Sequence, residues 1–189
     1  MGFTDHDDAA LVARWQQGDA TAFAELVSRW QQPIARFLTH FLGRPDLVSD
    51  SCQEVFLRAL VAGPRYRECG AFCAWLYRIA VNVARDLRRR RRHGSISLAN
   101  TEIVSAAPAP DAISERREAD RLVADAVATL PEPLRLVLVL RHYEEMSFED
   151  IARTTGTPAS TLKSRFAAAL STLRTRLRNL DCSPKESRS

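Results

Sequence analysis

The sequence predicts an all-α protein with two small helical domains joined by a flexible linker, the C-terminal one containing a helix-turn-helix. Apolar residues recur with the 3.6-residue period of a helix in several stretches of the 189-residue chain. Glycine is scarce, at 7 residues, and aromatic residues make up a modest 7%, which favours helices over a β-sandwich. Residues 93–113 instead combine Gly, Ser, Ala, Asn and Pro without a sustained period, which is typical of a flexible linker.

The linker divides the chain into a domain over 1–92, a domain over 114–180 and a tail over 181–189 that we expect to be disordered. In the first domain, helices are predicted over 7–17, from Asp19 to about 41, over 46–61 and over 71–92. Asp19 is placed to cap the second of these helices, and Pro33 should kink or split it.

The helix predicted over 71–92 has two distinct faces. Its core stripe consists of Phe72, Trp75, Leu76, Ile79, Val83 and Leu87. A second face carries Arg78, Asn82, Arg85 and Arg89, and the helix ends in five consecutive arginines, Arg88 to Arg92. Five arginines repel one another unless an anion neutralises them, and phosphate can do so with bidentate geometry. This face therefore predicts a polyanionic partner.

The second domain is predicted to be helical throughout. Its first helix should span 114–129, and the apolar stretch over 134–145, which could pass for a buried strand, is interpreted as a helix that lies beneath the motif that follows. In that motif Ser147 and Asp150 have the spacing of a capping box, and Gly156 provides the stop.

The last helix is predicted to bury Leu162, Phe166, Ala169, Leu170, Leu173, Leu177 and Leu180. Its outward stripe would then hold Thr161, Ser164, Arg165 and Ala168, with Lys163 on the flank. A short helix, a Gly turn and such a second helix are typical of a helix-turn-helix that enters the DNA major groove. Arg165 would read guanine and Lys163 would contact phosphate. By pattern alone, an αα-hairpin in an ordinary bundle remains open.

Composition narrows the remaining function classes. The net charge of +4 is unevenly distributed, with an acidic first segment and the arginine run over 88–92. The four cysteines, Cys52, Cys69, Cys73 and Cys182, form no CxxC and no zinc-finger spacing, so we expect reduced thiols and neither metal nor cofactor. No catalytic constellation appears, and the protein should not be an enzyme by itself. No apolar run approaches ~20 residues, so we expect a cytoplasmic protein without direct membrane insertion.

Three segments carry a family resemblance: DSCQEVFLRAL (50–60), FCAWLYRIAVNVARDLRRR (72–90) and SFEDIARTTGTPASTLKSRFAAAL (147–170). In this order and spacing they resemble the bacterial RNA polymerase sigma factors of the extracytoplasmic-function (ECF) type, in the sigma-70 family. The resemblance implies a protein that binds core RNA polymerase, including the β′ clamp helices and the β subunit. It also implies promoter DNA and an anti-sigma factor as partners.

The resemblance implies a role for three faces. Asp50, Gln53 and Glu54 would dock on the clamp helices. The −10 element would be read and melted by one set of residues, namely Arg78, Asn82, Arg85, Arg88 and Arg89, together with the loop from Arg65 to Gly70. The −35 element would be read by another set, namely Thr161, Lys163, Ser164 and Arg165.

One departure and two alternatives accompany this resemblance. Family members often carry a basic residue after the SR pair, where this chain has Ala167 and Ala168, which predicts a weaker or altered −35 preference. The main alternative is a helix-turn-helix regulator that binds duplex operators without polymerase. A small serine recombinase also ends in a helix-turn-helix, but it would need an α/β catalytic domain where this sequence predicts only helices.

Overall fold

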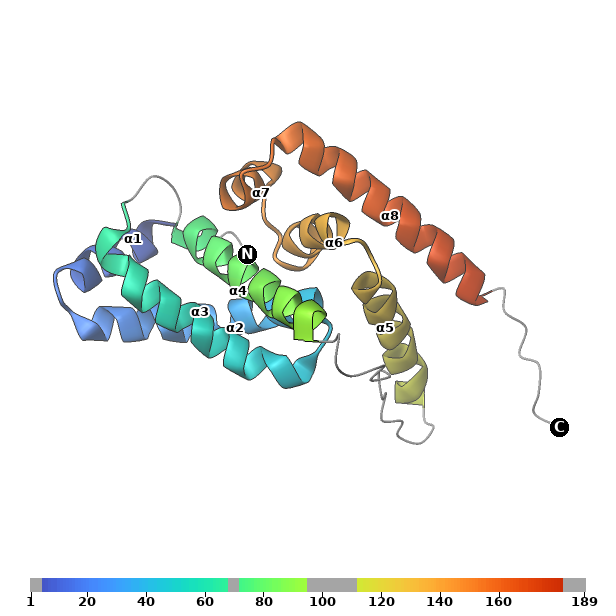
Figure 1. Cartoon of the computed structure of the whole chain (residues 1–189), viewed down its shortest axis with the longest axis horizontal. Coiled ribbons are helices and arrows are strands. Elements are labelled where there is room, and N and C mark those ends of the chain that lie inside the picture. The colour runs from blue at the N-terminus through green and yellow to red at the C-terminus, as the bar shows by residue number, and fades with distance from the viewer. Residues whose placement is uncertain (1–4, 68–71, 95–111, 182–189) are drawn as a thin grey trace.

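The structure, a computed structural model, describes residues 5–67, 72–94 and 112–181, and these residues form helices and short connections without a strand. Helices α1 to α4 make up an N-terminal unit (5–94) and helices α5 to α8 a C-terminal unit (112–181), which lie side by side (Figure 1). The predicted linker falls almost wholly outside the described residues, and so do residues 182–189 of the predicted tail. Of the helices described, none is long and apolar enough to span a bilayer.

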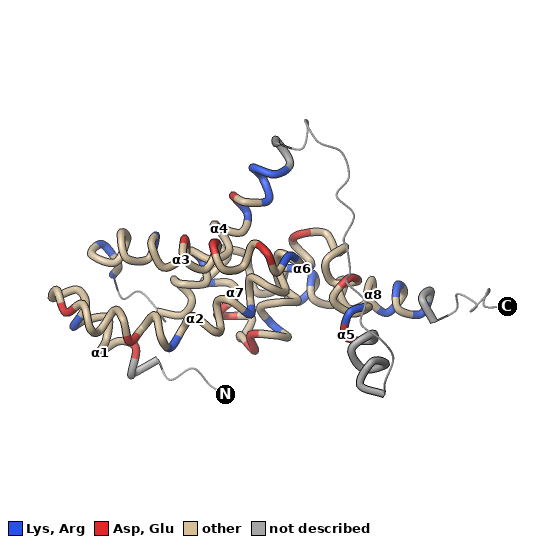
Figure 2. The backbone as a smooth tube through the Cα atoms, turned by 90° about the horizontal axis from the view of Figure 1, so that it is seen from below, with Lys and Arg blue, Asp and Glu red and all other residues tan. Residues whose placement is uncertain are grey.

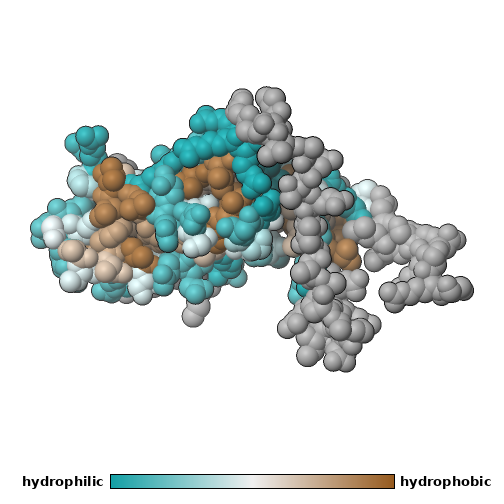
Figure 3. All heavy atoms as spheres, turned by 60° about the horizontal axis from the view of Figure 1, so that its bottom comes forward, coloured by the Kyte–Doolittle hydropathy of each residue, from teal (hydrophilic) through white to brown (hydrophobic). Residues whose placement is uncertain are grey.

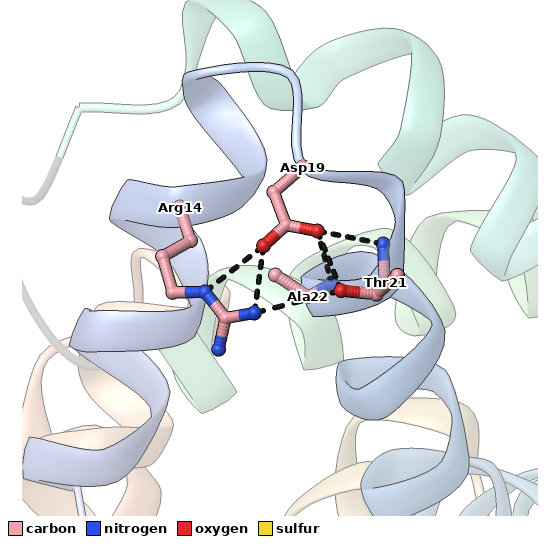
Figure 4. Close-up of polar contacts among 4 residues, drawn as sticks. All are labelled: Arg14, Asp19, Thr21 and Ala22. Atoms are coloured by element: carbon pink, nitrogen blue, oxygen red, sulfur yellow. Dashed lines mark hydrogen bonds and ion pairs between the residues drawn. The ribbon is translucent and has the colours of Figure 1, made fainter.

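The first two helices are joined by a capped turn. Helix α1 spans Asp5–Gln16 and α2 spans Ala20–Leu42, with Asp19 as the N-cap of α2. The Asp19 carboxylate accepts hydrogen bonds from the backbone N–H groups of Thr21 and Ala22, and Arg14 of α1 pairs with it at 2.6 Å (Figure 4). The side-chain hydrogen bond from Thr21, followed by that from Arg14, lowers the pKa of Asp19 from 3.8 to about 2. The capping role predicted for Asp19 is confirmed.

The N-terminal unit continues through α2 without a break. Pro33 lies inside α2, so the split that its presence allowed does not occur. After Gly43 come the short helix η1 (Pro45–Leu47), then α3 (Val48–Ala62) and the short helix η2 (Gly63–Arg65). Gly63 is buried where the Trp15 indole approaches, and a Cβ there would lie 1.9 Å from a ring carbon. Any larger residue at position 63 would therefore have to displace the Trp15 ring.

Helix α4 (Phe72–Gly94) is the central helix of the N-terminal unit. The Tyr77 ring packs edge-on against Trp30 and Phe37 of α2, with ring centroids 6.2 and 5.6 Å apart. Burial extends beyond the predicted stripe to a set of further positions, namely Tyr77, Ala80, Val81 and Ala84. Trp75, expected in the core, is only half-buried. The difference arises because α4 packs against α2, α3 and α7 rather than against one neighbour.

The C-terminal unit is helical as predicted. It consists of α5 (Ala112–Ala128), α6 (Glu132–Leu138), the π-helical turn η3 (Val139–Tyr143), α7 (Phe148–Thr155) and α8 (Ala159–Asp181). The apolar stretch that could have been a strand forms α6 and η3, which are buried beneath α7 and α8.

The predicted helix-turn-helix is formed by α7 and α8. The Ser147 hydroxyl accepts a hydrogen bond from the Asp150 N–H at 3.0 Å, and the Asp150 carboxylate accepts one from the Ser147 N–H, which completes the capping box. Gly156 ends α7 with a φ of +69°, a left-handed conformation that glycine adopts without steric cost. The start and the end of α7 thus follow from local sequence.

Candidate nucleic-acid and protein interfaces

The basic residues of α4 form the first candidate interface. Asn82 and Arg89 are exposed, and the arginine-rich last turns of α4 project away from the rest of the described helices (Figure 2). Arg88 is half-buried, with its guanidinium 5.8 Å from the centre of the Phe41 ring. An exposed row of guanidinium groups on a rigid helix suits the sugar–phosphate backbone of a nucleic acid.

Two of the predicted α4 residues contact the C-terminal unit instead of solvent alone. Arg78 donates hydrogen bonds to the backbone carbonyls of Arg153 and Thr154, the latter at 3.2 Å, in the last turn of α7. The Arg85 Nε lies 2.8 Å from a carboxylate oxygen of Glu132 at the start of α6. The structure therefore brings only part of the predicted set together on an open surface.

An aromatic cluster adjoins this face where α4 begins. The Trp75 ring lies 4.7 Å from that of Tyr66 and 5.6 Å from that of Phe72, and the flanking Arg65 and Arg67 are exposed. Half-buried rings beside guanidinium groups can stack unpaired bases while phosphates are held nearby. The rest of the predicted loop, residues 68–70, lies outside the described residues.

The exposed stripe of α8 differs from the predicted one by a rotation of the helix. Its exposed residues recur with helical spacing, namely Ser160, Lys163, Ser164, Ala167, Ala168, Ser171, Arg174 and Thr175. Thr161 and Arg165, expected to face outward, are half-buried, and Leu170, expected inside, is 47% exposed. The packing of Leu162 and Ala169 against the rest of the unit sets this rotation.

The rotation changes the order of the candidate DNA contacts on α8. Lys163 and Ser164 lie within the exposed stripe, whereas Thr161 and Arg165 lie outside it and are half-buried. On a helix in the major groove, central residues reach base edges and marginal ones reach the phosphate walls. Because Lys163 is exposed and Arg165 is half-buried, we propose that Lys163, rather than Arg165, reads bases.

The polar face of α3 forms the second kind of interface, one suited to a protein partner. Asp50 and Gln53 are exposed as predicted. Glu54 is partly covered, because it pairs with Arg58 at 2.7 Å, and Arg58 also pairs with Asp86 of α4 at 3.0 Å. Through Arg58, Glu54 thus helps to join α3 to α4, a structural role that the sequence did not indicate.

A groove of about 680 Å³ lies between α2 and α3, and the pattern-based reasoning missed it. Its apolar lining comes from both helices, namely Phe23, Val27, Val48, Cys52, Phe56, Leu57 and Leu60, and Gln53 lines it as well. Leu57 is 58% exposed and Val61 beyond it 80%. Apolar side chains thus reach the surface of the N-terminal unit (Figure 3). The available signal was that α3 carries the large apolar residues Leu57, Leu60 and Val61 in addition to the apolar residues that it buries.

The two cysteines that the structure describes, Cys52 and Cys73, do not belong to a cluster of potential metal ligands. Cys73 is buried in the core and Cys52 lines the groove, where burial raises the pKa of its thiol. Cys69 and Cys182 lie outside the described residues. Among the residues that the structure describes, no group of three or more His, Cys, Asp or Glu side chains could hold a metal ion.

Two protein-family models match the chain, one on each unit. The model for sigma-70 region 2 matches residues 26–94, and the model for sigma-70 region 4 matches residues 120–173. The first match contains α4 with its basic face, and the second contains α7 and the part of α8 up to residue 173. Both candidate nucleic-acid faces therefore fall inside the matched regions.

Curated relatives match over most of the chain. An ECF RNA polymerase sigma-E factor of Haemophilus influenzae is 36% identical over 86% of this chain and 90% of that protein. An RNA polymerase sigma-H factor of Pseudomonas aeruginosa is 33% identical over 88% of this chain and 91% of that protein. The corresponding sigma-E factor of Escherichia coli K12 is 32% identical over 86% of this chain.

Solved structures show the same arrangement of helices. CnrH, in complex with the cytosolic domain of CnrY, matches with a TM-score of 0.71 and 28% identity, over 91% of this chain and 97% of that one. RpoE of Bartonella quintana, in complex with the anti-sigma factor NepR, matches with a TM-score of 0.64 and 20% identity, over 82% and 96% of the two chains. The second likeness is one of fold.

Proposed function

This chain belongs to the ECF sigma factors of the sigma-70 family, and we propose that it binds core RNA polymerase, directs it to specific promoters and helps to melt the −10 region. The observation that carries the proposal is the pair of separate candidate DNA faces, on α4 and on α8, each within a matched family region. Polymerase would supply the chemistry of RNA synthesis, so the protein acts as an initiation factor in the cytoplasm and not as an enzyme.

The two DNA faces suit different states of the promoter. The exposed stripe of α8 suits a duplex −35 element, because a helix fits the major groove and reads base edges there. The guanidinium groups of α4 and the rings of Tyr66 and Trp75 suit an unpaired strand at −10, because stacking and phosphate contacts do not need a duplex. This division of roles favours a sigma factor over a regulator that binds duplex operators alone.

The α3 face and the adjoining groove are proposed to dock on the β′ clamp helices of polymerase. Asp50 and Gln53 offer polar contacts beside the apolar lining of Leu57 and Leu60. An apolar groove with a polar rim is the usual anatomy of a protein interface. An anti-sigma factor is a further proposed partner, because RpoE was solved with the anti-sigma factor NepR and CnrH with the cytosolic domain of CnrY.

The proposal is tested by run-off transcription with purified core polymerase on fragments of the source genome. The chain should yield discrete transcripts that core polymerase alone does not produce. If the chain yields no such transcript but binds duplex DNA tightly without polymerase, it would be assigned as a helix-turn-helix regulator instead of an active sigma factor.

A further inference from the structure

The C-terminal unit lies against the basic face of α4. We propose that the free chain is autoinhibited: its own C-terminal unit covers part of the −10 face and is held there by a latch centred on Glu144. The latch rests on geometry alone, whereas the inhibitory consequence rests on the proposed −10 role of α4. The occupant is thus a part of the same chain, α6 to α7, and not a second protein.

The latch is a buried carboxylate held by two helices of the opposite unit, α2 and α4. Glu144 follows η3 and is 1% exposed. Its carboxylate accepts hydrogen bonds from the Arg36 guanidinium in α2, at 3.1 and 2.7 Å, and from the Tyr77 hydroxyl in α4, at 2.7 Å. A buried carboxylate is stable only when paired and hydrogen-bonded. Separation of the units would remove all three of these bonds at once.

Arginines from each unit cap helices of the other. Arg78 of α4 donates to the last-turn carbonyls of α7, and Arg135 of α6 donates to the Phe41 carbonyl in the last turn of α2 at 3.2 Å. The last carbonyls of a helix have no partner within it and carry its negative end charge, so a guanidinium satisfies both needs. These caps tie Arg78 to the C-terminal unit, and Arg85 is tied to it through Glu132.

The interface also contains a defect that makes it possible to open. The Nε of Arg135 and one terminal nitrogen of Arg88 are buried without a hydrogen-bond partner among the described residues. Burial and the charge of Arg88 lower the pKa of Arg135 to about 10. An unsatisfied buried donor opposes burial. The hydrogen-bonding groups around Glu144 are therefore all paired, whereas two donors around Arg135 are not. This imbalance lowers the free energy needed to separate the units.

Promoter DNA or polymerase would shift this closed form to an open one. Phosphate accepts a charge-assisted hydrogen bond that is stronger than the carbonyl bonds Arg78 makes in the closed form. Any ligand that binds only the open form shifts the population toward that form. The apparent affinity of such a ligand equals its affinity for the open form multiplied by the fraction of molecules that are open. In the closed form the exposed stripe of α8 stays free, so the inhibition acts on −10 binding and not on −35 binding.

The test compares full-length variants that change charge identically. Glu144→Gln removes the buried latch carboxylate, and Glu149→Gln removes an exposed one in α7 and serves as the control. Small-angle X-ray scattering measures compaction, and fluorescence anisotropy measures affinity for a labelled thymine-rich single strand of about 12 nucleotides. We expect a larger radius of gyration and about tenfold tighter binding for Glu144→Gln, as for a closed form that holds about nine in ten molecules. The control should match the wild type.

Arg36→Gln provides a second variant in case Glu144→Gln loses its helical circular dichroism. This variant removes the partner of Glu144 in the N-terminal unit, at a half-exposed position. It should bind the single strand more tightly than the wild type does, although it has lost a positive charge. The proposal is overturned if the wild type is already as extended as the latch variants, or if they open without a gain in affinity. Run-off transcription by the wild type reports on the sigma-factor assignment independently of these outcomes.

Discussion

The capping carboxylate of Asp19 makes a pH-dependent contribution to stability at the scale of a single residue. Its pKa is about 2 in the folded chain and close to 3.8 when the chain is unfolded. A depressed folded-state pKa adds stability that is fully present above pH ~4 and is lost as the pH falls from ~4 to ~2. We expect the free energy of unfolding of the wild type to lose this contribution over that pH range, as measured by urea unfolding.

The matched variant is Asp19→Asn, because Asn is also a good N-cap but is neutral and cannot form the ion pair with Arg14. The difference between the urea midpoints of wild type and variant should shrink as the pH falls through this window. A difference that stays constant from pH 5 to pH 2 would mean that the pKa of Asp19 is not lowered in solution by its hydrogen bonds with Thr21 and Arg14.

Helix α8 yields a second prediction at the residue scale. Lys163 is exposed on α8, whereas Arg165 is half-buried. Lys163→Ala should therefore relax the base preference at one or two −35 positions, a loss of ~1–3 kcal/mol of discrimination. Arg165→Ala should weaken all promoters alike and reduce the salt slope by about one unit.

The measurement is transcription from a promoter library randomised at −35, at several salt concentrations, with wild type and both variants. The reversed pattern, in which Arg165→Ala alone relaxes the preference, would show that α8 turns on the DNA toward the stripe predicted from sequence. Equal preferences in all three proteins would indicate that the element is read through its shape.

At the scale of elements, the groove between α2 and α3 is the surface on which polymerase binding should depend. Leu57 lines the groove and is 58% exposed, so Leu57→Gln removes apolar contact area with little effect on the fold. We expect it to weaken binding to core polymerase by about tenfold, equivalent to ~1.4 kcal/mol. The affinity can be measured by fluorescence anisotropy with labelled protein.

Leu122→Gln is the control, since Leu122 is 40% exposed on α5, outside the groove. It should bind polymerase as the wild type does. Equal losses in both variants, or no loss in Leu57→Gln with its helical content retained, would exclude the groove from the interface. Asp50→Arg, on the polar rim, tests the same surface through charge.

Local sequence signals predicted the individual elements well, because their causes are local. The Asp19 cap, the capping box of Ser147 and the stop at Gly156 depend on residues within one turn of the helix end, and all are confirmed. The rotation of α8 was predicted less well. Leucines and alanines occur on more than one side of that helix, and only the packing of Leu162 and Ala169 decides which side is buried.

At the scale of the whole molecule, the contact between the units was not predictable from the sequence. The two units share one continuous hydrophobic core, and the Arg36–Glu144 pair joins residues 108 positions apart. No period or motif signals a contact of this kind. The docking and DNA-contact residues chosen by resemblance stay predictions, and the structure adds that Arg78, Arg85 and Glu54 also have partners within the chain.

The α4 face is proposed to open promoter DNA when the protein is bound to polymerase. The most direct measurement is permanganate footprinting of thymines in the −10 region at a promoter found by run-off transcription. We expect reactive thymines only when the protein and core polymerase are both present. Asn82→Ala should reduce that reactivity, because Asn82 is exposed on α4, while a filter assay shows closed complexes retained. Unreactive thymines with the wild-type holoenzyme, or full reactivity with Asn82→Ala and Arg85→Ala alike, would contradict the account.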